Sequence, residues 1–293
     1  MTSPDANPEI RVRWERLLLP ACLVSFGLLA VTQLLFLWLS LFRDLRFGRM
    51  GATPSLDSYV KVFTDGFYLT ALWRTIEISA IVAVVALLLA WPMAYLLARM
   101  PSRRANPLLA LAITASFVTI IIKVLGLIII FSADGILNGA LLALGVVDRP
   151  LSPYGSVAGV VLGQLLYTLP FMLLTLFSVI RTIPRSLEDA AEIHGASRWR
   201  AIMRVVMPLS LPGVIGGTLV VFNLSMGSFT SAALLGGGRV LTLPVLIQQT
   251  AMVQIKYGLA GTLACVLLVA TMMINLISVV AVSGRGPIRA GTV

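Results

Sequence analysis

Long stretches without any charged residue constrain this chain more than any other feature of its sequence. Five uncharged, mainly apolar runs reach or exceed the ~20 residues that a helix needs to cross a hydrocarbon core of ~30 Å. They are Leu17–Phe42, Ile78–Ala98, Tyr154–Ile180, Val205–Gly238 and Tyr257–Gly284, and a sixth run, Ala105–Ser132, is interrupted only by Lys123. Lipid offers no partner to free backbone N–H and C=O groups, so these runs must be helical. We predict an all-α membrane protein with six transmembrane helices.

The Val205–Gly238 run is longer than one span requires, and we place its helix between about Pro212 and Leu235. Two shorter helices are expected outside the spans. Leu56–Asp65 has the pattern of a helix that lies along the membrane surface, and Asp134–Gly145 is too short to span, so it is interfacial or re-entrant.

The charged residues support a membrane protein and indicate its orientation. Only 12% of the residues are charged, against about a quarter in soluble proteins. The net charge of +10 comes from cations scattered between apolar runs, so nucleic-acid binding is not expected. Basic residues favour cytoplasmic segments, which predicts a cytoplasmic N-terminal segment (1–16), a membrane domain (17–284) and a cytoplasmic tail (285–293).

The sequence offers no constellation for catalysis or for a metal site. Cys22 and Cys265 each lie inside an apolar run, and His194 is the only histidine. A zinc site needs more ligands than these residues supply, and a hydrolase site of the His-Glu-x-x-His type is absent. We therefore predict no catalytic residue, no metal and no enzymatic activity for this chain.

The segment 181–208 is a polar region between two apolar runs and predicts two short helices joined by a hinge. Ser186 is expected to cap the first helix, with Asp189 as a capping-box partner, and Gly195 to end it in a left-handed conformation. Ser197 is expected to cap the second helix, which Pro208 ends. The helical period predicts two faces, one formed by Leu187, Ala190, Ala191 and His194, the other by Trp199, Ile202, Met203 and Val206. This helix-pair pattern taken alone fits two interpretations equally well: a docking site for a partner, or an amphipathic loop resting on lipid headgroups.

The spacing favours a more specific interpretation. Asp189-Ala190-Ala191 is followed by Gly195 and then by Val205-Val206-Met207-Pro208, in the loop before the second-last span. This pattern resembles the EAA loop of permease subunits in binding-protein-dependent ABC importers, and further segments resemble the spermidine/putrescine branch. The family usually has glutamate where this chain has Asp189, and both side chains are acidic. The further segments are Ala90–Arg99, Asp134–Asn138, Leu169–Leu173 and Leu234–Gly237.

The resemblance implies the importer permease fold and a set of partners. They are ATPase subunits, a second permease subunit of different sequence, a periplasmic solute-binding protein and membrane lipid, at the inner (plasma) membrane of a bacterial cell. The chain contains no Gly-x-x-x-x-Gly-Lys-Ser/Thr loop, so ATP and Mg are expected on the ATPase and no cofactor on this chain. The residues that the resemblance assigns to ATPase coupling are Glu188, Asp189, Ala190, Ala191, Gly195, Ala196, Ser197 and Pro208.

Four polar residues inside the spans are candidates for the solute pathway: Lys123, Gln164, Asn223 and Ser228. Lys123 either lines the pathway or extends its side chain to the outer interface, and the others either line the pathway or bond between helices. The family branch suggests a polyamine substrate, while another amine, an opine, an organic acid or a phosphonate stays open. An ATP-independent secondary transporter is the alternative of a different class, although the spans lack paired carboxylates for ion coupling.

Overall fold

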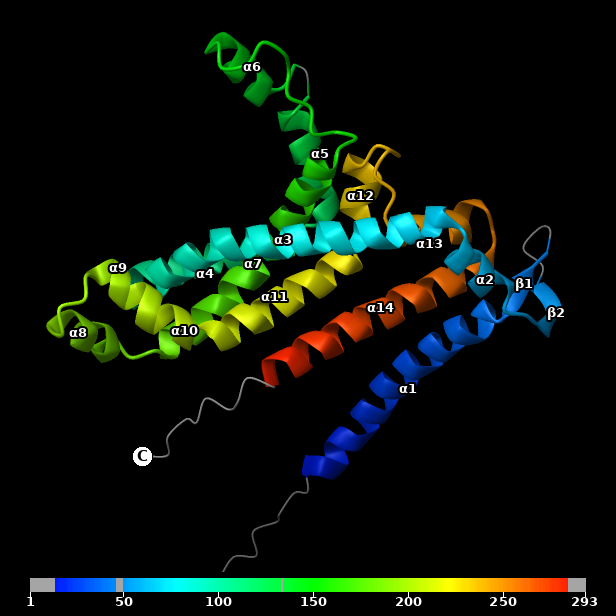
Figure 1. Cartoon of the computed structure of the whole chain (residues 1–293), viewed down its shortest axis with the longest axis horizontal. Helices are drawn as coiled ribbons and strands as arrows, with labels where there is room; N and C mark the ends of the chain where they lie inside the picture. Colours follow the sequence, from blue (N-terminus) through cyan, green and yellow to red (C-terminus); the bar gives the residue numbers. More distant parts are fainter. Residues whose placement is uncertain (1–13, 46–49, 133, 284–293) are drawn as a thin grey trace, which may run out of the picture.

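The computed structural model describes residues 14–45, 50–132 and 134–283, and most of them are in helices (Figure 1). Three long helices form the core: α3 (Gly66–Arg99), α7 (Val157–Thr182) and α11 (Leu211–Met226). Beside them, α1 (Trp14–Ser40) and α14 (Tyr257–Ser283) form an antiparallel pair (Figure 1). This arrangement agrees with the predicted all-α class.

Small side chains allow the core helices to approach each other closely. α3 buries Ala83, Ala86, Ala90 and Ala94 at helical spacing. On α11, a Cβ atom at Gly213 would lie 2.9 Å from Val179, and one at Gly217 would lie 2.7 Å from the sulfur of Met172, both on α7. Membrane helices associate through such small residues because lipid supplies no hydrophobic force between them.

The described residues contain three helices long and apolar enough to cross a membrane, α3, α7 and α14, and up to five if each of two bent pairs counts as one span. In α1, the apolar part Val24–Ser40 is shorter than a span. The predicted count of six is therefore not confirmed. Of the predicted domain boundaries, segment 1–16 lies largely outside the described residues and 285–293 wholly so, and these boundaries stay predictions.

Two of the predicted spans are not continuous helices. The run Ala105–Ser132 forms α4 (Ser102–Phe117) and α5 (Ile120–Ile130), which meet at a bend of 95°. The helix predicted to end near Leu235 ends at Met226, and α12 (Thr230–Leu235) is separate. α12 packs on α7 at Gly163, where an added Cβ would lie 2.6 Å from Leu235. This docking requires the chain to turn after Met226, which composition alone does not reveal.

Short elements lie outside the core helices, some beside the first turns of α3 and others beyond the end of α5 (Figure 1). The predicted surface helix is α2 (Asp57–Thr64), and the predicted interfacial helix is α6 (Ile136–Ala143). Sequence reasoning missed the antiparallel hairpin of β1 (Phe42–Asp44) and β2 (Met50–Pro54). It also missed α13 (Leu243–Gln248) with its π-helical continuation η3 (Gln249–Val253), because that apolar stretch is too short to signal a span.

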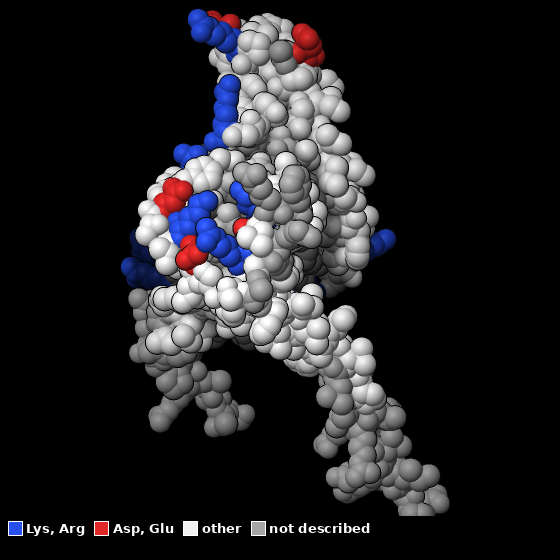
Figure 2. All heavy atoms as spheres, turned by 90° about the vertical axis from the view of Figure 1, so that its right-hand side faces the viewer, with Lys and Arg blue, Asp and Glu red and all other residues white. Residues whose placement is uncertain are grey.

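A carboxylate joins the hairpin to α14. Asp44 accepts hydrogen bonds from the backbone N–H groups of Gly258 and Leu259, both at 2.8 Å. These donors belong to the first turn of α14, where backbone N–H groups have no partner within the helix and a negative charge is favourable. Figure 2 shows this end of the molecule, where acidic and basic side chains gather while most of the surrounding surface is uncharged.

Candidate coupling site

Segment 181–208 forms two short helical units at one end of the molecule (Figure 1). The first is α8 (Ser186–Ile193). The second is α9 (Arg198–Ala201), which continues through the π-helical turn η2 (Ile202–Val206) into α10 (Met207–Leu209). α10 meets α11 at Ser210, where the helix direction changes by 63°. The two-helix loop predicted from the sequence is thus present.

Gly195 forms the hinge between the two helices in the predicted left-handed conformation, with φ at +83°. Its N–H donates to the carbonyl oxygen of Glu192 (2.9 Å), and the next N–H, of Ala196, donates to that of Ala191 (3.0 Å). This pair of bonds is the Schellman arrangement that ends helices at glycine. A Cβ atom at position 195 would meet no atom of the described part of the chain within 4 Å, so the constraint on this residue there is conformational and not steric.

The predicted caps of these helices are wrong in detail. Ser186 lies inside α8, whose N-cap is Arg185, and no side-chain hydrogen bond caps the helix. Ser197 is the N-cap of α9, as predicted, but its side chain accepts no cap hydrogen bond. Pro208 lies within α10 instead of ending the helix. Arg185 already has helical φ and ψ angles, which moves the start of α8 one residue earlier than the capping pattern indicates.

The residues predicted to couple to an ATPase divide into two groups. Most are at least partly exposed: Asp189, Ala190, Gly195, Ser197 and Pro208 are exposed, and Ala191 and Ala196 are half-buried. Glu188 instead points into the protein, where it forms an ion pair with Arg99 of α3, and each of the two side chains is only 12% exposed. The hydroxyl of Tyr95 also donates to Glu188 Oε2 at 2.7 Å. Sequence reasoning missed Arg99 and Tyr95, which lie about ninety residues away.

Large apolar side chains are exposed at the tip of the loop. Ile193 is 84% exposed and Trp199 is 66% exposed, and Leu187 is also exposed. Of the second predicted face, Ile202 and Val206 are instead buried in the core, so that face is divided between surface and interior. Exposed apolar clusters of this kind mark interaction sites.

The four pathway candidates do not converge on one site. Lys123 lies early in α5, just after the bend, and its Nζ donates to the carbonyl oxygen of Leu166 on α7 at 3.4 Å. Gln164 of α7 is buried, and its Oε1 has no hydrogen-bond partner among the described residues. Ser228 is half-buried in the connection between α11 and α12.

Asn223 forms the inter-helix bond that was one of its two predicted roles. Its amide exchanges two hydrogen bonds with Asn275 of α14, at 3.0 and 2.8 Å. Sequence reasoning missed Asn275, although an amide in an apolar run is itself a signal for such pairing.

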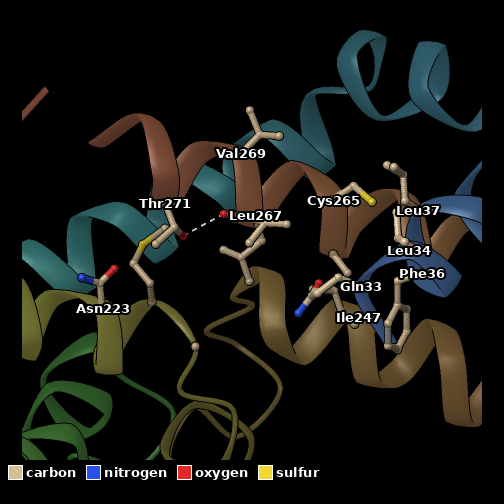
Figure 3. Close-up of a pocket in the computed structure, with 14 residues that line it drawn as sticks. Gln33, Leu34, Phe36, Leu37, Asn223, Ile247, Cys265, Leu267, Val269 and Thr271 are labelled. Carbon is tan, nitrogen blue, oxygen red and sulfur yellow. Dashed lines mark hydrogen bonds between the residues drawn. The ribbon is translucent and has the colours of Figure 1, made fainter. Parts of the chain in front are cut away.

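Asn223 also borders a cavity of about 490 Å³ between α1, α11, α13 and α14. Figure 3 shows mainly apolar side chains around this cavity, including Ile247 and Leu267, with Asn223 at one side and Cys265 beside Leu37. The polar side chains at its wall are few, so the cavity suits an apolar group better than a charged solute. Within the described residues, no three acidic, histidine or cysteine side chains gather as a metal site would require.

The sequence profile of one protein family matches residues 86–286, which include the whole of segment 181–208. The family is described as "Binding-protein-dependent transport system inner membrane component". The chain belongs to this family. It is a multi-pass, inner-membrane permease of an ABC importer, as the spacing around Gly195 led us to expect.

Two groups of curated relatives resemble this permease. The spermidine/putrescine transport system permease protein PotB of Escherichia coli K12 is 34% identical over 185 residues, 63% of this chain and 67% of the relative. PotB of Haemophilus influenzae is 30% identical, with 64% of this chain and 65% of the relative covered. The chain thus spans about two thirds of the length of these relatives. The putative 2-aminoethylphosphonate transport system permease protein PhnU of Salmonella paratyphi A is 25% identical over 93% of this chain and 91% of the relative.

Solved importers share the fold of this permease. A chain of a bacterial alginate ABC transporter, in complex with an alginate-bound periplasmic protein, superposes with a TM-score of 0.63 at 17% identity, covering 76% of this chain and 81% of that one. A chain of the MetNI methionine ABC transporter gives 0.56 at 14% identity, covering 75% and 96%. At these identities the likeness concerns the fold alone.

Proposed function

We propose that this permease forms a solute pathway together with a second permease subunit of different sequence, and that ATPase subunits dock on its loop 181–208. ATP and Mg are bound on the ATPase, so this chain transmits movement and does not hydrolyse ATP. A periplasmic solute-binding protein delivers the solute to the opposite end. Closure of the ATPase dimer then changes which side of the membrane the pathway faces.

The observation that carries this proposal is the form of the loop. A glycine-hinged helix pair exposes Ile193 and Trp199 at its tip, while Ile202 and Val206 behind it are buried in the core. The tip is therefore suited to contact a partner, and its base is continuous with the spans. An amphipathic loop resting on lipid would need neither a glycine with a defined left-handed conformation nor residues of the loop buried in the protein core.

For the substrate we propose a small aliphatic amine. The relatives named for spermidine and putrescine and the relative named for 2-aminoethylphosphonate share an ammonium group on a short alkyl chain. The polyamines are the first candidates because identity to those relatives is higher. The aminophosphonate is the second candidate because its relative aligns over nearly the whole chain.

The proposed orientation places the loop and both chain ends in the cytoplasm. α3 runs toward the loop, and the last turns of α14 and the first turns of α1 point to the same side of the molecule (Figure 1). This agrees with the bias of basic residues toward these segments. Protease accessibility of tags at the two ends in sealed spheroplasts tests the orientation.

Uptake and co-purification test the proposal together. A strain lacking this chain is expected to lose uptake of labelled putrescine or spermidine, with labelled 2-aminoethylphosphonate as the second solute and an organic acid as the comparison. Ile193→Gln is expected to prevent co-purification of the ATPase. Ile136→Gln, on an equally exposed residue of α6, is the matched control.

Loss of amine uptake in the strain lacking this chain, together with no ATPase co-purifying with the wild-type chain, would favour an ATP-independent transporter. Loss of organic-acid uptake alone would keep the importer and refute the amine assignment. Normal ATPase binding by the Ile193→Gln variant would show that the tip of the loop is not part of the docking surface.

A further inference from the structure

Three side chains on one face of α3 form a continuous stack that ends at the coupling loop. Trp91, Tyr95 and Arg99 are spaced four residues apart, so they lie above one another along the helix. The rings of Trp91 and Tyr95 are parallel to within 6°, with centroids 6.0 Å apart. The guanidinium of Arg99 lies 5.7 Å from the centroid of the Tyr95 ring, a favourable cation–π distance. We call these three residues the α3 stripe.

The Arg99 end of the α3 stripe binds the beginning of the coupling loop. Arg99 Nη1 donates to the carbonyl oxygen of Ile183 at 3.0 Å, and Arg185 donates to the carbonyl oxygen of Arg99. The Arg99 side chain also pairs with Glu188 on α8, and the Tyr95 hydroxyl donates to the same carboxylate. Because Arg99 and Glu188 are both largely buried, loss of either partner leaves the other charge without compensation.

The Trp91 end of the α3 stripe binds the other end of the same loop, where it continues into α11. Trp91 Nε1 donates to the hydroxyl oxygen of Ser210 at 3.1 Å. Ser210 is completely buried and occupies the 63° bend between α10 and α11. Its hydroxyl in turn donates to the carbonyl oxygen of Met207 at 2.8 Å. One face of α3 thus contacts the loop at its first residues, at α8 and at its last bend.

We propose that the α3 stripe fixes the coupling loop to the core at both ends, so that α8 and the core helices α3, α7 and α11 move as one rigid body during transport. The residues of the stripe are positioning residues. Their mechanical role rests on the proposed function, in which ATPase docks on the loop. Movement of the ATPase then reaches the core without being absorbed by the loop.

The rest of the loop and of α3 is arranged as this role requires. The buried alanines of α3 hold it tightly against the core, so a contact with α3 is a contact with the core. Asp189, next to Glu188, is exposed and remains free to face a partner. The two acidic neighbours therefore face in different directions, one toward α3 and one outward.

Distance measurements between spin labels test the rigid attachment. Labels are placed at Ser186→Cys on α8 and Leu88→Cys on α3, both exposed positions outside the proposed docking tip, in a chain whose Cys22 and Cys265 are replaced by alanine. We expect a narrow distance distribution that is unchanged when ATP and vanadate are added to the chain purified with its co-purifying subunits. A distribution whose peak moves on ATP binding would overturn the proposal.

Variants of the Arg99–Glu188 pair and of its neighbours show whether the α3 stripe is responsible for the narrow distance distribution. Glu188→Gln and the milder Tyr95→Phe are expected to broaden the distribution, and Trp91→Phe, which keeps the stacking, to do so less. The exchange Arg99→Glu with Glu188→Arg is expected to narrow it again, and a pocket of about 240 Å³ beside the pair leaves room for the exchanged side chains. Glu77→Gln, on an exposed glutamate of the same helix, is the matched control.

A Glu188→Gln distribution as narrow as that of the wild type would overturn the proposal. A second result would also overturn it: a distribution that is broad in Glu188→Gln and stays broad in the Arg99→Glu, Glu188→Arg exchange. The broadening would then come from a general loss of fold and not from loss of the specific ion pair. The comparison is made on the full-length chain without nucleotide, so it remains informative if no ATPase co-purifies. Absence of the ATPase would instead refute the docking of the proposed function.

The functional consequence is measured as solute moved per ATP hydrolysed. A general loss of folded protein lowers transport and hydrolysis together and leaves this ratio unchanged. Loss of the attachment in Glu188→Gln is expected to lower the ratio about 5-fold or more, a range typical of coupling between sites, and the charge exchange is expected to restore it. An unchanged ratio would show that the stripe has no role in transmission.

Discussion

The ammonium of Lys123 donates to the carbonyl oxygen of Leu166, 3.4 Å away on another helix. Leu166 lies four residues before Pro170, which has no N–H, so α7 leaves this carbonyl without its usual partner. Lys123 supplies the missing donor from α5. A basic residue in one apolar run and a proline in another are thus parts of a single contact.

This contact predicts an energetic coupling between Lys123 and Pro170. Lys123→Met is expected to lower the free energy of unfolding by about 1 kcal/mol more in the chain with Pro170 than in the Pro170→Ala variant. The reason is that alanine at position 170 restores an N–H donor within α7, so Lys123 is no longer needed there. Reversible unfolding of the purified chain in mixed micelles measures the four variants. Lys61→Met, on an exposed lysine of α2, is expected to show no coupling to Pro170. Equal effects of Lys123→Met in both backgrounds would contradict the contact.

The amide pair of Asn223 and Asn275 predicts a stability effect without a transport effect. Replacement of either residue by alanine breaks both hydrogen bonds between α11 and α14 and is expected to cost about 0.6–2 kcal/mol of unfolding free energy. Asn106→Ala, at an exposed position of α4, is the control and is expected to cost much less. If Asn223 instead contacts solute, Asn223→Ala will reduce uptake while Asn275→Ala will not.

At Gly195 the order of substitutions is predicted by the backbone. Alanine is expected to cost about 1 kcal/mol because φ is +83°, and asparagine less, because it tolerates this conformation. Aspartate matches asparagine in shape but adds a charge at the proposed docking surface, so only aspartate is expected to abolish ATPase co-purification. Gly139→Ala, on a glycine of α6 with equal free space, is the control. Equal ATPase binding by the asparagine and aspartate variants would exclude a close acidic or apolar partner here.

Asp44 predicts a stabilising cap for α14. Asp44→Ala is expected to lower the free energy of unfolding by about 1–2 kcal/mol, since two N–H groups of the first turn lose their acceptor. Thermal unfolding of the purified chain measures the loss. The ion pair of Asp57 with Arg43, at 3.8 Å and on the surface, provides the comparison, because Asp57→Ala is expected to cost little. Equal losses for the two variants would exclude the cap.

The spans and the hinge were predictable from local sequence, for a physical reason. The length of an uncharged run decides whether a helix can cross a bilayer, and this identified α3, α7 and α14. A glycine after a short polar helix is sufficient to predict a left-handed end, which Gly195 confirms. The family, too, was evident from spacing alone, because the residues that define the loop lie within twenty positions of each other.

Contacts between distant residues were decided only by the tertiary structure. The same rules failed at the bend after Phe117 and at the end of α11, where packing of α5 and α12 against α7 overrides the preference for a continuous helix. They gave no sign that Glu188, which the resemblance assigned to ATPase coupling, pairs with Arg99 when α8 docks on α3. They treated Lys123 and Pro170 separately, although the two meet at Leu166. Sequence determines which segments enter the membrane because burial depends on composition, whereas the partner of each buried polar group depends on how the helices are placed against each other.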